Sequence, residues 1–102
     1  MEAGELRFTV EIERLDGNTW SPYAVMWCAI ETLDEAEGIR QYEVRTRWTQ
    51  QLWEMVGLRH LDKGFRVVWV HAGTTLYLEV DGIVDQGNRR RELRLSCHEI
   101  MP

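Results

Sequence analysis

The sequence is poor in cysteine and proline and has no long apolar run. Its two cysteines, Cys28 and Cys97, lie in distant apolar segments, without the close Cys/His spacing of a zinc site. We expect both thiols to be buried and reduced, as in a cytosolic protein, with a disulfide as the lesser alternative. No stretch approaches the roughly 18 apolar residues of a membrane span, and the acidic start MEAGELRF predicts no signal peptide.

Recognisable catalytic and cofactor motifs are also lacking. The sequence contains no G-x-S-x-G nucleophile motif and no phosphate-binding glycine loop of the Walker type. Its histidines, His60, His71 and His98, fall in different predicted elements, with no Cys or Asp at ligand spacing. We therefore expect a protein that is not an enzyme and that binds no cofactor or metal.

The net charge of −5 is spread unevenly along the chain. Residues 1–43 hold most of the acids, whereas residues 44–102 have a small excess of bases. An acidic chain gains little from the counterion release that drives nucleic-acid binding, so wrapping DNA is disfavoured. The asymmetry indicates either opposed charged faces, which suit head-to-tail contact between copies, or an ordinary solvated surface.

What the sequence does contain is a repeated alternation of apolar and polar residues. In Leu6–Arg14 the apolar side chains Leu6, Phe8, Val10 and Ile12 share one face, which is typical of a half-buried β-strand. Tyr23–Thr32 is apolar on both faces and is interpreted as a central strand. Further strands are predicted at Tyr42–Trp48, Phe65–His71, Thr75–Val84 and Arg89–Ile100.

The connecting segments have turn and cap chemistry. Asp16-Gly17-Asn18 predicts a turn, and Asp81-Gly82 predicts a bulge or bend within its strand. Thr49–Asp62 has helical spacing, with Thr49 as the N-cap, and Leu33–Gln41 is interpreted as an exposed, partly helical loop. Together these features predict one domain over residues 1–102. Its fold class is mainly β: a small antiparallel barrel or sandwich of about six strands with one or two short helical segments, the long two-faced strands favouring a barrel.

The candidate contact residues are found among the five tryptophans and in one basic run. Trp27, Trp48 and Trp69 are predicted to be core residues, whereas Trp20 and Trp53 are predicted to be more exposed. Trp53 is a candidate subunit contact, because exposed tryptophan is enriched at interfaces. The run Arg89, Arg90 and Arg91 is either a solvated strand entrance, a patch that pairs with an acidic neighbour or, third, a DNA contact.

The order of these parts resembles the bacteriophage head-tail joining family, also called head-closure, stopper or head-completion proteins. The resemblance covers nearly the whole chain, and its most specific parts are the opening strand LRFTVEIER, the Trp27-x-Ala29 strand and the closing strand RRRELRLSCHE. The sequence departs from the family pattern at Leu33–Gln41, which is short, and at Gln50–Leu61, which is long. Detailed contacts in those two regions are not carried over.

The resemblance implies a β-barrel subunit that assembles in the host cytoplasm and resides in the virion neck. About twelve copies would form a ring below the portal and its adaptor, receive the tail-completion or tail-tube protein and help to retain DNA. It also implies a loop projecting into the channel, for which Asp34, Glu35 and Glu37 are the candidates. Their negative charge would repel passing DNA, so that contact with it is at most transient.

Two other functions stay open at this point. A tail-completion or tail-terminator subunit is also a small β protein that forms rings. A small β-barrel that binds oligonucleotides is the alternative from another class, because tryptophans can stack on bases. The acidic balance argues against that second alternative.

Overall fold

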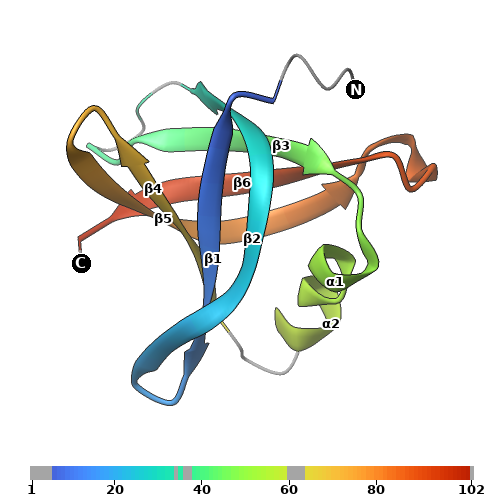
Figure 1. Cartoon of the computed structure of the whole chain (residues 1–102), viewed down its shortest axis with the longest axis horizontal. Helices are drawn as coiled ribbons and strands as arrows, with labels where there is room; N and C mark the ends of the chain where they lie inside the picture. The colour runs from blue at the N-terminus through green and yellow to red at the C-terminus, as the bar shows by residue number, and fades with distance from the viewer. Residues whose placement is uncertain (1–5, 34, 36–37, 60–63, 102) are drawn as a thin grey trace.

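The chain folds as a six-stranded antiparallel sheet that closes into a barrel (Figure 1). The computed structural model describes residues 6–33, 35, 38–59 and 64–101. The order round the barrel is β1-β2-β3-β6-β5-β4, and closure follows because β1 pairs with both β2 and β4. The strands are β1 (Phe8–Asp16), β2 (Thr19–Thr32), β3 (Gln41–Arg47), β4 (Phe65–His71), β5 (Thr74–Asp85) and β6 (Glu92–Ile100). The predicted fold class is confirmed.

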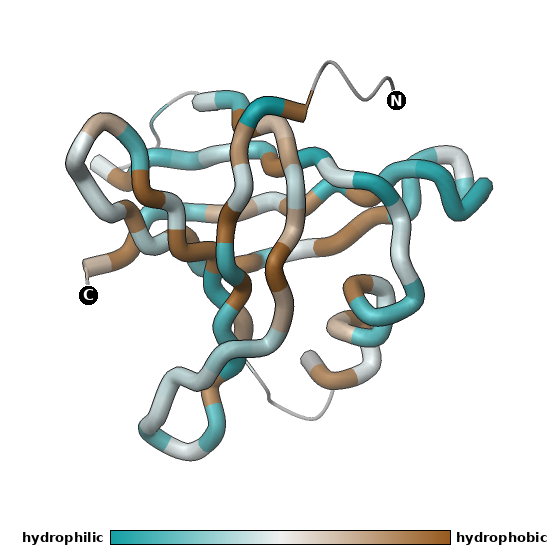
Figure 2. The backbone as a smooth tube through the Cα atoms, viewed as in Figure 1, coloured by the Kyte–Doolittle hydropathy of each residue, from teal (hydrophilic) through white to brown (hydrophobic). Residues whose placement is uncertain are grey.

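Alternation along each strand builds one continuous core inside the barrel. In β6, Leu93, Leu95 and Cys97 point inward and are buried, as the sequence predicted. The other strands contribute further buried side chains to the same cluster, among them Val10, Ile12, Met26, Cys28, Tyr42, Val44, Phe65, Val67, Trp69, Leu78 and Val80. Figure 2 shows the resulting change between hydrophobic and hydrophilic positions along the strands. Removing these side chains from water is the main force that stabilises the fold.

Two turn features follow the predicted chemistry. Gly17 has a φ of 64°, which a residue without Cβ adopts at no steric cost, and it lies in the β1–β2 hairpin turn. In β5 the pairing with β6 shifts between Val80 and Gly82, so the predicted bulge is confirmed. The extra residue bends the strand and changes which side chains lie opposite each other.

A short helical segment covers the gap where β2 leaves β3. The β2–β3 ladder ends at the Cys28/Thr46 pair, and the Thr46 hydroxyl then donates to the Trp27 carbonyl at 2.8 Å. Beyond this point come α1 (Gln50–Trp53) and α2 (Met55–Arg59), which lie beside β2 in Figure 1. The Thr49 side chain accepts from the Leu52 backbone N–H at 3.2 Å, which confirms the predicted N-cap. No helix within the described residues is long and apolar enough to cross a membrane.

The helical segment is fastened to both the core and β2. Leu52 and Met55 are buried in the barrel core. The Tyr23 hydroxyl donates to the Gln51 carbonyl at 2.6 Å, and the Gln51 amide donates back to the Tyr23 carbonyl at 3.1 Å. This reciprocal pair fixes the position of α1 against the separated part of β2.

Several predicted positions differ in the structure. Trp27 was predicted to be in the core, but its side chain points outward, because Met26 and Cys28 take the inward positions of β2. Trp20 and Trp53 are half-buried instead of exposed. The last strand begins at Glu92, so the preceding arginines lie before it and not within it.

Candidate interaction face

The outer surface of β2 exposes large apolar side chains just before the point where its pairing with β3 begins. Val25 is 66% exposed and Trp27 is 51% exposed, whereas Met26 and Cys28 between and beside them are buried. A single exposed apolar residue is ordinary, but neighbouring ones beside a hollow are typical of a binding surface. The outer side of β2 is therefore part of the candidate interaction face.

A hollow of about 270 Å³ opens beside these two side chains, where β2 separates from β3. Its lining is largely apolar and comes from β2, β3, α1 and the segment before β1. The lining residues are Leu6, Val25, Met26, Trp27, Thr46, Arg47, Thr49, Gln51 and Leu52. Arg47 is exposed and is the one charged group among the described residues that line the hollow.

A second, open hollow of about 480 Å³ lies farther along the same strands. Ala29, the next outward residue of β2 after Trp27, pairs with Arg45 of β3, and both line this hollow together with Arg7. The remaining lining residues are Phe8, Ile30 and Glu31. The outer face of β2 and β3 thus combines an exposed indole with guanidinium groups. We call Val25, Trp27, Arg45 and Arg47 the Trp27 wall.

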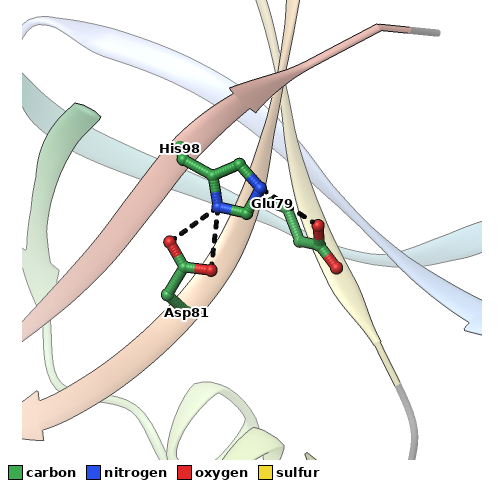
Figure 3. Close-up of polar contacts among 3 residues, drawn as sticks. All are labelled: Glu79, Asp81 and His98. Carbon is green, nitrogen blue, oxygen red and sulfur yellow. Dashed lines mark hydrogen bonds and ion pairs between the residues drawn. The ribbon is translucent and has the colours of Figure 1, made fainter. Parts of the chain in front are cut away.

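The far side of the barrel holds a polar cluster of Glu79, Asp81 and His98 (Figure 3). The His98 Nδ1 atom lies 2.8 and 2.7 Å from the two carboxylate oxygens of Asp81. Its Nε2 atom lies 3.3 Å from a carboxylate oxygen of Glu79. The two ring nitrogens therefore face different carboxylates. Among the described residues, no group of three or more His, Cys, Asp or Glu side chains can hold a metal ion.

The sequence did not indicate this cluster, because the cluster depends on strand register. Glu79 pairs with His98 across β5 and β6, and the bulge at Val80/Gly82 then brings Asp81 to the same imidazole. The bulge itself was predicted, but the partner of β5 was not. The pairing of β5 with β6 is the information that would have predicted this cluster.

A second outer cluster is centred on Arg66, whose role the sequence did not indicate. Its guanidinium lies 4.3 Å from the Trp20 ring and 4.4 Å from the Tyr77 ring. Its Nε donates to Glu13 at 2.7 Å, and both charged side chains are largely covered. Cation–π contact and a charge-assisted hydrogen bond together hold β1, β2, β4 and β5 to one another.

The basic run lies in an exposed connection between the short 3₁₀ turn η2 (Gln86–Asn88) and β6. Arg89, Arg90 and Arg91 are all exposed. Arg90 has a φ of 54°, and its backbone N–H donates to the Asp85 carboxylate at 3.2 and 3.4 Å. Its guanidinium lies 5.5 Å from the Trp48 ring. These contacts fix the loop while leaving its positive charge at the surface.

The structure also describes Trp53 and one residue of the predicted acidic loop. Trp53 packs in part against the protein's own core, which leaves a reduced surface for any neighbour. Glu35 is exposed in the β2–β3 connection. Asp34 and Glu37 lie outside the described residues. Glu35 and the basic run thus belong to different connections, the first before β3 and the second before β6.

Burial shifts the titration of two groups near the helical segment and core. Desolvation raises the pKa of the Cys28 thiol to about 12. The pKa of Tyr23 is also raised, first by desolvation and then by the negative charge of Glu54. Cys28 and Cys97 are both buried, as predicted. A thiol in this environment stays protonated and unreactive at neutral pH.

No protein-family model, curated protein or solved structure matches this chain. The resemblance to phage head-tail joining proteins therefore rests on the strand patterns of the sequence.

Proposed function

We propose that this chain is a structural subunit of a tailed-phage virion that forms a ring in the neck. The ring connects the portal and adaptor of the head to the tail and helps to retain packaged DNA. The observation that supports this best is that Val25 and Trp27 expose large apolar side chains on the outer surface of the closed barrel. The family resemblance supplies the virion context.

The closed barrel restricts how such a subunit can meet its neighbours. Each strand pairs on both sides over at least part of its length, and the part of β2 that leaves β3 lies against α1. The described strands therefore leave little open sheet edge for strand addition. Contact must then be made by outward side chains and loops. Tryptophan and arginine are the residues most enriched at the centres of protein interfaces, and the Trp27 wall contains both.

The remaining parts fit the same role. The exposed Arg89, Arg90 and Arg91 loop offers positive charge to an acidic neighbour, and the uncovered part of Trp53 offers apolar contact area. Asp34, Glu35 and Glu37 are proposed as the negative lining of the channel, where they repel sliding DNA. The portal or adaptor is the proposed partner above the ring, and the tail-completion or tail-tube protein the partner below.

The test is electron microscopy of particles made by the source phage with this gene disrupted. Tailless heads beside separate complete tails, with empty or leaking capsids, are the expected result. Full heads with overlong or unfinished tails would assign the chain to tail completion or termination. Normal infectious virions would overturn the structural role. Complementation with the wild-type gene is the matched control.

One specific observation favours the alternative function, that of a small β-barrel that binds oligonucleotides. Trp27 lies on the same outer face as Arg45 and Arg47, and an exposed indole among arginines can stack a base and hold its phosphates. A gel shift with a single-stranded oligonucleotide tests this. Binding that weakens steeply with salt and is lost in Trp27→Ala would support the alternative over a purely structural role.

A further inference from the structure

We propose that the Trp27 wall of one copy docks on the opposite wall of a second copy, formed by Glu79, Asp81 and Val84 of β5. We call this second surface the carboxylate wall. The inference deepens the proposed ring function and rests on it. It names the two surfaces that meet, which the family resemblance does not provide.

The strand order places the two walls on opposite sides of the molecule. Going round the barrel, β5 lies three strands from β2 in either direction. The strand register connects them in one row, since Ala29 pairs with Arg45, Arg45 with Arg94, and Arg94 with Val84. Two complementary surfaces on opposite sides of one subunit give a head-to-tail contact. Such a contact closes a ring when the rotation between neighbouring copies divides a full turn, and gives an open filament when it does not.

The charges of the two walls are complementary. The Trp27 wall contributes the guanidinium groups of Arg45 and Arg47. The carboxylate wall contributes Asp81 and Glu79, whose side chains are 49% and 44% exposed. Both carboxylates contact His98, yet a carboxylate has about four acceptor sites and can also accept from an arginine. Opposite charges steer the two walls together and disfavour contact between two like walls.

The two walls also match in their apolar groups. Val84 is 54% exposed on β5, where it pairs with Arg94 and follows Asp81 by three residues along the strand. The hollow next to Trp27 offers room for an aliphatic side chain of the partner. Protein interfaces usually have apolar contacts at the centre and charged or polar pairs around them.

Cysteine cross-linking between two differently tagged copies tests the pairing. One copy has Trp27→Cys and the other Val84→Cys, while the native thiols are buried and do not compete. Under mild oxidation of a concentrated mixture, the 27–84 disulfide is expected to exceed the 27–27 and 84–84 disulfides several-fold. Asn18→Cys, at an exposed turn off both walls, replaces Trp27→Cys in the control mixture.

A charge reversal sharpens the test. Arg47→Glu in the Trp27→Cys copy is expected to lower the 27–84 yield several-fold, whereas Arg40→Glu, an exposed arginine off both walls, leaves it unchanged. Equal yields of all disulfide pairs, or no 27–84 disulfide, would overturn the proposal. Protection of the position-27 thiol by a single-stranded oligonucleotide, without any 27–84 excess, would overturn it in favour of nucleic-acid binding.

Failure of this contact is distinguishable from failure of the proposed function. A neck defect in the gene disruption, without 27–84 cross-linking, rejects the docking surfaces and leaves the neck role standing. A 27–84 excess with normal virions after disruption supports the contact between copies and rejects the neck role.

Discussion

At the scale of single residues, two tryptophans show how position decides what the same side chain does. Trp69 is buried in the barrel, with its ring 5.1 Å from Phe8, 6.2 Å from Tyr42 and 4.9 Å from His71. Trp27 has half of its surface in water and takes no inward position. The first therefore contributes to folding, and the second is available for contact with another molecule.

Replacing the two tryptophans is expected to change stability by very different amounts. Trp69→Ala removes a buried aromatic ring and leaves a cavity, so we expect a loss of about 3–5 kcal/mol in the free energy of unfolding. Trp27→Ala is expected to change it by less than about 1 kcal/mol. Urea denaturation followed by circular dichroism measures both. A loss for Trp27→Ala as large as that for Trp69→Ala would contradict an outward role for Trp27.

At the scale of elements, the helical segment compensates for an incomplete β2–β3 wall. Because β2 and β3 stop pairing at Cys28 and Thr46, the core would be open there without α1 and α2. Leu52 and Met55 cover it, and the mutual hydrogen bonds of Tyr23 and Gln51 hold the cover in place. The same separation of strands forms the hollow beside Trp27, so the cover also shapes the candidate face.

The N-cap of this element gives a test at the same scale. Thr49→Ala removes the acceptor of the Leu52 backbone N–H and is expected to lower the free energy of unfolding by about 1 kcal/mol. Thr49→Ser keeps the hydroxyl and is expected to retain most of the stability. Thermal or urea unfolding compares the two variants with wild type. If alanine and serine behave alike, the cap does not stabilise α1.

At the scale of the whole molecule, burial of ionisable groups couples folding to pH. The pKa of Cys28 is about 12 when folded, against 9.0 for a free thiol, so the folded state holds this proton more tightly. The stabilisation is fully present below pH 9.0 and is lost as pH rises toward 12. The raised pKa of Tyr23 acts in the same direction above pH 10.0.

We therefore expect the free energy of unfolding to fall as pH rises from 9 to 12. Cys28→Ala removes the titrating thiol, so its stability is expected to be lower at neutral pH but to fall less steeply over this range. Urea unfolding at several pH values measures both slopes. A slope in Cys28→Ala as steep as in wild type would show that another group controls the alkaline loss.

The sequence by itself determined the strands and the side of most of them that faces inward. Alternation in β1, β3 and β6 leaves one apolar face, which the hydrophobic effect buries whatever the neighbours are. The Thr49 cap and the bulge near Gly82 were also predictable, because each depends on local backbone chemistry. The resemblance to a phage family added an expected function but no contact geometry.

Only the tertiary structure decided which face of β2 is inside and which residues meet across strands. Val25 and Trp27 alternate with Met26 and Cys28, so both faces are apolar and alternation cannot choose between them. The choice depends on the register with β1 and β3, since pairing sets the direction of every side chain along the strand. The His98 cluster, the covered Arg66 and the opposed walls are likewise set by strand order and register, which join residues that are distant in the sequence.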